Sequence, residues 1–125
     1  MAIINRNATD HFTKTVNTTD ATATQIDAIT IGADESGIIT IKVVGFDKVD
    51  GAAVTGIVGY RYVKTAGTLT LGSAIAIEPI VADTAVSGGT FAASVVSNNI
   101  VVKVTGKASV NMTWASMIKQ FALAL

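Results

Sequence analysis

Apolar and polar side chains alternate along much of the chain, and this period of two constrains the fold more than any other feature. In IITIKVVGFD, Ile39, Ile41 and Val43 fall on one side of an extended strand. Thr40 and Lys42 fall on the other side. Thr, Val and Ile dominate the sequence, and these residues favour strands over helices. We therefore expect an all-β protein without βαβ crossovers.

Eight or nine segments carry this alternation, and short turns rich in glycine, aspartate or asparagine separate them. The segments are HFTKTVNTT (11–19), TQIDAITIG (24–32), IITIKVVGFD (38–47), VTGIVGYRYVKT (54–65), TLTL (68–71), SAIAIEPIVAD (73–83), TFAASVVS (90–97), IVVKVT (100–105) and VNMTWASMIKQF (110–121). They predict an antiparallel two-sheet β-sandwich of about eight strands, jelly-roll-like or immunoglobulin-like.

The length of 125 residues predicts a single domain. We assign the sandwich to residues 13–125. Residues 1–12, which include Ile3, Ile4 and Arg6, are either an arm that pairs with the sheet edge of a neighbouring subunit or the first edge strand of their own sheet.

Trp114 is the only tryptophan, and it lies in the last of these segments. It shares a period-two stripe with Val110, Met112 and Ile118, in which Ser116 is the one weak member. Alanine, methionine and glutamine would also allow a helix here, but the stripe favours a strand. We expect Trp114 to be a core residue rather than a binding platform.

Composition argues against several functions. Nine basic residues balance nine acidic ones, so the phosphate-neutralising surplus of a nucleic-acid binder is missing. No apolar run reaches 18 residues, and the polar start MAIINRNATDHF predicts neither a membrane span nor a secretory signal. Charged residues make up only 14% of the chain and hydrophobic ones 50%, which predicts that part of the surface is buried against other subunits.

No set of residues predicts catalysis, a metal or a cofactor. His11 is the only histidine, cysteine is absent, and no serine lies in a nucleophile elbow. The acidic turn around Asp47 and Asp50 lacks the EF-hand pattern, so we read it as solvated. Tyr60, Tyr62 and Trp114 could form a sugar-binding platform, but their alternating strands favour packing in a core or a subunit interface.

Several motifs across residues 18–121 resemble small β-sandwich domains of tailed-bacteriophage virion proteins. They are the threonine-rich entry from Thr18 to Thr24, the V-x-G-like step at Val44 and Gly45 with a turn glycine at Gly51, and a closing hairpin that runs from Val104, Thr105 and Gly106 to Trp114. Such domains occur in tail-fibre and head-fibre modules and in capsid decoration or auxiliary proteins. The resemblance implies a non-enzymatic structural protein located in the virion.

Within that class, a single-domain chain favours a capsid decoration or auxiliary head protein that stabilises the shell through subunit contacts. The alternative is a tail-associated or head-fibre-associated protein, such as an adaptor or receptor-binding domain. A carbohydrate-binding module is a more remote alternative. Expected partners are the major capsid protein or tail and fibre proteins, together with sister copies in a homo-oligomer that could be a trimer. The expected assembly interface comprises Ile3, Ile4, Arg6, Phe12, Phe121, Leu123 and Leu125.

Overall fold

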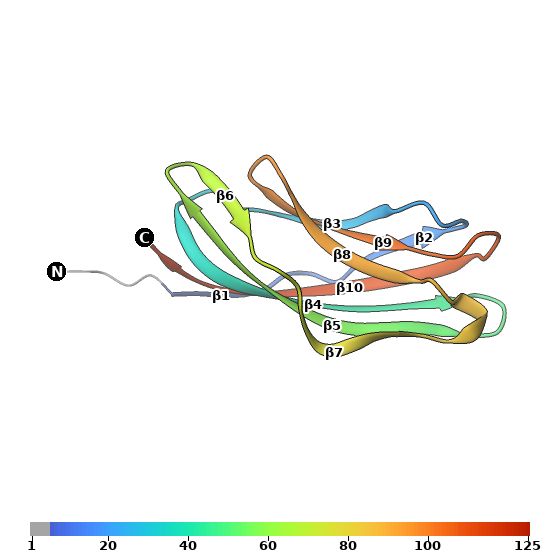
Figure 1. Ribbon diagram of the computed structural model, residues 1–125. Coiled ribbons are helices and arrows are strands. Elements are labelled where there is room, and N and C mark those ends of the chain that lie inside the picture. The colour runs from blue at the N-terminus through green and yellow to red at the C-terminus, as the bar shows by residue number, and fades with distance from the viewer. Residues whose placement is uncertain (1–5) are drawn as a thin grey trace.

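The computed structural model describes residues 6–125, and the side chains of this region are described from Thr9 onward. Ten strands form two layers, which Figure 1 shows one above the other. The strands are β1 (Arg6–Asp10), β2 (Lys14–Thr18), β3 (Thr24–Thr30), β4 (Glu35–Asp47), β5 (Ala53–Thr65), β6 (Thr68–Leu71), β7 (Ile75–Ala82), β8 (Thr90–Val96), β9 (Asn99–Thr105) and β10 (Met112–Ala124). A short 3₁₀ turn, Thr84–Val86, precedes β8. The predicted all-β antiparallel sandwich is confirmed.

The larger layer is a seven-stranded sheet with the path β1-β10-β4-β5-β6. β2 also pairs with β10, and β7 also pairs with β5. The smaller layer is the three-stranded sheet β3-β9-β8. The long strands β4, β5 and β10 form the centre of the larger sheet because each has 13 residues and pairs along most of its length.

The hydrophobic core lies between the two sheets and follows the period-two stripes. Ile39, Ile41 and Val43 on β4 are buried, and so is the β10 stripe of Met112, Trp114 and Ile118. β10 continues as a strand to Ala124, so the prediction of a strand rather than a helix in the last segment is confirmed. Trp114 is fully buried, and its indole Nε1–H donates a hydrogen bond to Thr18 Oγ1 at 2.9 Å.

Two expectations about chain connections are wrong. The segment from Val104 to Trp114 is not a hairpin, because β9 belongs to the small sheet and β10 to the large one, so this connection crosses between layers. The strand expected over 11–19 is shorter than predicted, because β2 covers only Lys14–Thr18 of it. Residues 11–13 separate β1 from β2, and Phe12 is not in a strand.

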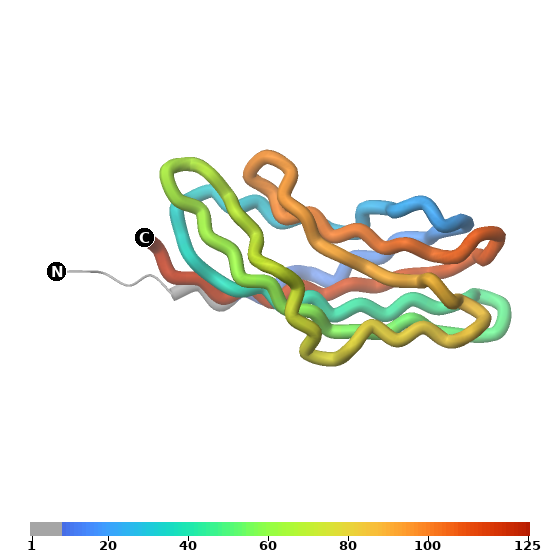
Figure 2. Tube along the Cα trace, viewed as in Figure 1, coloured from blue at the N-terminus to red at the C-terminus, as the bar shows by residue number. Residues whose placement is uncertain are grey.

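β1 lies beside the end of β10, so the described chain begins and ends at one end of the sandwich (Figure 2). Arg6 is opposite Leu123 and Asp10 is opposite Lys119 in an antiparallel register. Residues 6–10 therefore form an edge strand of the large sheet within this chain. Ile3 and Ile4 lie outside the described residues.

The inward stripe of β10 contains one polar member, Ser116, whose side chain is 1% exposed. Its Oγ atom has no hydrogen-bond partner among residues 6–125. Because an unsatisfied buried hydroxyl is destabilising, we expect Ser116→Ala to leave the free energy of unfolding unchanged or to raise it by up to about 1 kcal/mol. Urea unfolding followed by circular dichroism measures this. A loss of more than about 1 kcal/mol would show that the hydroxyl has a partner.

Candidate assembly surface

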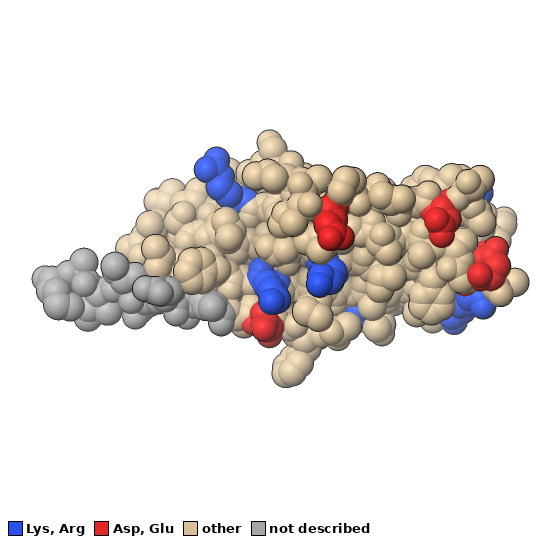
Figure 3. Space-filling model, turned by 90° about the horizontal axis from the view of Figure 1, so that it is seen from below, with Lys and Arg blue, Asp and Glu red and all other residues tan. Residues whose placement is uncertain are grey.

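The face of the seven-stranded sheet that points away from the small sheet combines exposed large apolar side chains with Lys42, Arg61 and Lys119, and we call it the outer face. It carries the even-numbered residues of β4 and the odd-numbered residues of β5 and β10. Six large apolar side chains on it are between 36% and 47% exposed: Ile38, Val44, Phe46, Met117, Phe121 and Leu123. Figure 3, which views this face, shows basic side chains near its middle and acidic ones at several places, among many uncharged residues.

A groove of about 550 Å³ is hollowed into the outer face near the ends of β4, β5 and β10. Ile38, Val63, Phe121 and Leu123 supply its apolar lining. Ser36 and Thr70 add hydroxyl groups, and Arg61 is the one charged residue in the lining. The groove arises because Ile38, Arg61 and Phe121 come from three adjacent strands, with Ile38 directly opposite both of the others. Its volume falls in the range of protein pockets that bind ligands or side chains.

The inner face of the same strands carries a polar network. Tyr62 Oη donates a hydrogen bond to Glu35 Oε2 at 2.5 Å, and Gln120 Nε2 donates one to Tyr62 Oη at 2.8 Å. His11 Nε2 lies 2.8 Å from Gln120 Oε1 and completes the chain of contacts. The network joins the β1–β2 link to β10, β5 and β4, beneath the sheet segment that forms the groove. It therefore ties these four segments together on the inner face.

Burial raises the pKa of Tyr62 well above its ordinary value near 10, and the hydrogen bond to Glu35 raises it further. The phenol therefore remains a hydrogen-bond donor in the folded protein. Its ring also packs against Gly37, where an added Cβ would lie 2.9 Å from Tyr62 Cζ.

We expect Tyr62→Phe to lower the free energy of unfolding by about 1–2 kcal/mol near pH 7, because Glu35 and Gln120 each lose a partner. The folded state holds the Tyr62 proton more tightly than the unfolded chain does, so wild-type stability falls as pH rises above about 10. The Tyr62→Phe variant has no phenol to ionise at this position, so its free energy of unfolding does not decrease for this reason. Urea titrations at pH 8 and pH 10.5 measure the free energy of unfolding of both proteins. The difference between wild type and Tyr62→Phe should be smaller at pH 10.5 than at pH 8, by somewhat less than about 1 kcal/mol. Parallel pH profiles would contradict this account.

The residues expected at an assembly interface lie in different places. Phe121 and Leu123 line the groove. Phe12 lies in the link between β1 and β2 and is 86% exposed, and Leu125 at the end of β10 is 70% exposed. Arg6 pairs through its backbone with Leu123. The groove brings Phe121 and Leu123 together, and Phe12 lies on the flank formed by β1 and β2.

Ile38, Arg61 and Val63 are groove residues that the sequence analysis did not select. A signal for them existed in the segment 38–44. Ile38 precedes Ile39 and Val44 follows Val43, so this strand has apolar residues on both faces. A strand with one face in water would show polar residues at the outward positions.

The other candidate chemistries receive no support. Tyr60, Tyr62 and Trp114 are at most 6% exposed, so they cannot form an open sugar platform. Instead the Tyr60 hydroxyl accepts a hydrogen bond from the backbone N–H of Ala93 across the sandwich. Within residues 6–125, no three acidic, histidine or cysteine side chains gather as a metal site. No helix in that range is long and apolar enough to cross a membrane.

Fold and surface together define a small all-β sandwich with an exposed apolar sheet face. No protein-family model matches the sequence, and no curated protein matches it. Among solved structures, the fold resembles part of a tailspike protein of Acinetobacter baumannii bacteriophage Fri1, a capsular polysaccharide depolymerase. That match covers 93% of this chain and 17% of the tailspike chain, with a TM-score of 0.51 and 10% identity.

A second similar structure is the tailspike protein of Acinetobacter baumannii phage AM24. The match covers 98% of this chain and 26% of that one, with a TM-score of 0.46 and 10% identity. The chain thus spans about a quarter or less of either tailspike. At this identity the likeness is one of fold.

Proposed function

We propose that this chain is a non-enzymatic structural module of a bacteriophage virion, located at the tail in a spike or fibre assembly. Its role is to join subunits through the outer face of the seven-stranded sheet. The fold likeness to part of a phage tailspike supports the tail over the capsid shell, which is where a decoration protein would bind.

The exposed apolar outer face is the observation that carries this proposal. Six large apolar side chains and an apolar groove lie on one sheet face that no part of residues 6–125 covers. Burying such a patch removes it from water, at roughly 25 cal/mol per Å² of apolar surface. Extensive exposed apolar patches on soluble proteins mark interaction sites. Adhesion through this face would stabilise an assembly by mass action and would need no chemistry.

Locating the chain in the particle tests the proposal. We expect antibodies raised against the purified chain to label the tails of intact virions in electron micrographs, and the chain to copurify with isolated tails. Labelling of the capsid shell would support the decoration protein instead. A chain found only in the soluble fraction of infected cells would contradict both assignments.

A separate assay tests the non-enzymatic role. Purified chain incubated with capsular polysaccharide from the bacterial host should leave the size distribution of the polymer unchanged by gel filtration. An active depolymerase is the positive control. Shortened polysaccharide chains would overturn this part of the proposal.

A further inference from the structure

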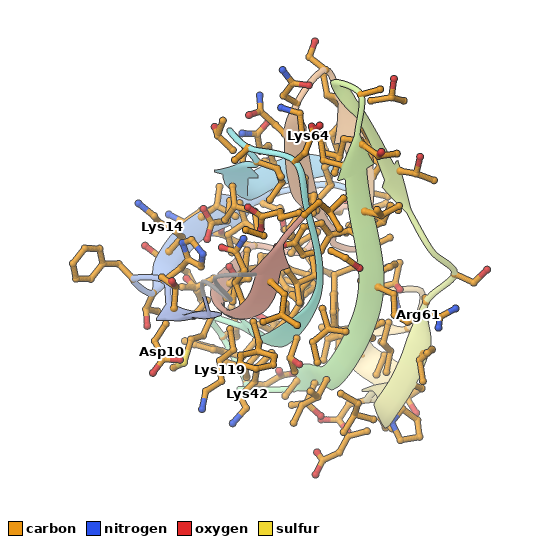
Figure 4. All side chains as sticks on the ribbon, turned by 90° about the vertical axis from the view of Figure 1, so that its left-hand side faces the viewer. Asp10, Lys14, Lys42, Arg61, Lys64 and Lys119 are labelled. Atoms are coloured by element: carbon orange, nitrogen blue, oxygen red, sulfur yellow. The ribbon has the colours of Figure 1, made fainter. Side chains whose placement is uncertain are left out.

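Within residues 6–125 each sheet has two free edges, and the edge formed by β1 and β2 carries features that hinder the addition of another strand. It is bulged, because residues 11–13 lie opposite only Met117 and Ile118 of β10. Figure 4 shows Lys14 projecting from this flank of the molecule. Bulges and lysines at an edge disfavour pairing with another chain.

Two further edges are also irregular. Residues 72–74 interrupt the edge formed by β6 and β7, and the pairing of β7 with β5 shifts register twice. Pro79, inside β7, has no N–H to donate. At the β3 edge of the small sheet the register shifts between Gln25 and Asp27. Asp27 is only 7% exposed and lies opposite the core residue Val102, and a charge that points inward also disfavours edge pairing.

The fourth edge, the free side of β8, lacks these features. Its sequence, TFAASVV, contains no charged residue, no glycine and no proline. All of its residues, Thr90–Val96, pair with β9 in an unbroken register. A regular, uncharged edge of this length accepts an extended strand along its unpaired N–H and C=O groups. By its own sequence, β8 is therefore the edge of this fold that is best suited to pairing with another chain.

A side chain from the opposite sheet reaches the free edge of β8. Tyr60, on β5, is buried, and its hydroxyl accepts a hydrogen bond from the backbone N–H of Ala93 at 3.1 Å. Because this N–H donates to the other layer, it points away from β9. Alternate residues of an antiparallel strand direct their N–H groups to the same side, so those of Phe91 and Val95 also face the free edge. Tyr60 therefore binds the central one of these three donors.

We propose that the Tyr60 hydroxyl keeps the free edge of β8 closed to a second copy of this chain. While the hydroxyl binds Ala93, an incoming strand cannot form consecutive hydrogen bonds, because Ala93 separates Phe91 from Val95. Without the hydroxyl, the β8 strands of two copies can pair antiparallel, since neither brings a charge that would lie opposite a like charge. Such a contact is isologous and closes as a twofold dimer. The inference concerns the chain alone and does not depend on its place in the virion.

Tyr60→Phe removes the hydroxyl and keeps the ring in the core. We expect it to raise the association constant of the purified chain at least about tenfold over wild type, because the Ala93 N–H of each copy gains a partner across the contact. Tyr62→Phe is the matched control, because Tyr62 is also a buried tyrosine of β5 but its hydroxyl bonds to Glu35 and Gln120 of the large sheet. Sedimentation equilibrium measures both variants. Equal association constants for the two would overturn the proposal.

A second substitution distinguishes pairing at β8 from association through the outer face or through partial unfolding. Ser94 is exposed on β8, and two lysines at this position would lie near each other in an antiparallel pair of β8 strands. Tyr60→Phe combined with Ser94→Lys should therefore return the association constant to the wild-type value. Ser94→Lys alone is the control and should associate as wild type does. A double variant that still associates as strongly as Tyr60→Phe would show that the contact does not involve β8.

Hydrogen exchange of the Ala93 amide follows the edge directly. In wild type this amide should be protected at every protein concentration, because it bonds to Tyr60 within the chain. In Tyr60→Phe the protection should be lost in dilute solution and should return as the concentration rises and the dimer forms. Circular dichroism verifies that the variants are folded. Exchange at Ala93 that does not depend on concentration in Tyr60→Phe would refute the proposal.

Discussion

Trp114→Ala is expected to lower the free energy of unfolding by about 3–5 kcal/mol, the range for removing a fully buried large aromatic side chain. Trp114 has no exposed surface and lies in the middle of the core stripe of β10. Its loss leaves a cavity that the surrounding strands cannot close, since Gly45 and Val16 lie directly opposite it on β4 and β2. It also leaves the Thr18 hydroxyl without its buried donor.

Urea unfolding followed by far-ultraviolet circular dichroism measures this loss, because the variant has no tryptophan to report by fluorescence. Trp114→Phe is the matched control, and it should cost less because it keeps most of the buried ring while losing the hydrogen bond to Thr18. Thr18→Val isolates the hydrogen bond and should cost about 1–2 kcal/mol. An unchanged denaturation midpoint for Trp114→Ala would contradict its place in the core.

Gly45→Ala is expected to destabilise the protein by about 3 kcal/mol, although it adds a single methyl group to a strand. Gly45 is the register partner of Trp114, and the indole ring lies over its backbone. A Cβ atom at Gly45 would lie 2.5 Å from Trp114 Cδ2, so the ring or one of the strands must move. Overpacking of this kind costs about 1–3 kcal/mol, and here the obstacle is a rigid ring enclosed by other core residues.

Gly59→Ala is the control for this substitution. Gly59 lies in the interior of β5, and a Cβ there would meet its nearest neighbour, Ile77 Cδ1, at 3.4 Å, an ordinary van der Waals distance. Alanine also has a smaller entropic cost than glycine in a strand, so Gly59→Ala should be neutral or stabilising by up to about 1 kcal/mol. Chemical denaturation of both variants gives the comparison. Similar stabilities for the two would show that the indole does not lie on Gly45.

The stripes on the long strands β5 and β10 predicted which of their residues are buried, whereas Ile75 and Ile77 of the alternating segment that forms β7 are exposed. Met112, Trp114 and Ile118 on β10 and Val58, Tyr60 and Tyr62 on β5 are buried as the alternation indicates. The turn at Ala66 and Gly67, between β5 and β6, also follows from the sequence. Both residues have the positive φ angles of a tight hairpin. These features are local, because the pleat of an extended strand and the geometry of a two-residue turn depend on neighbouring residues alone.

The break between β1 and β2 at residues 11–13 could not be predicted from the sequence pattern. The segment 11–19 alternates well enough to suggest a single strand. In the structure, the backbone N–H of His11 donates to the carbonyl of Ile118, and its side chain joins the network at Gln120, 109 residues away. A partner so distant in the sequence leaves no local trace in the pattern around His11.

The sequence by itself determined the strand type, the buried stripes and the main turns of this protein. Only the tertiary structure decided that β9 and β10 belong to different sheets, that β1 borders β10, and that Ile38, Val63 and Phe121 surround one groove. The physical reason is that the alternation determines which face of each strand is buried but does not determine which strand it pairs with. Strand pairing and the curvature of the sheet come from packing all ten strands at once, and they place the apolar groove at the end of the large sheet.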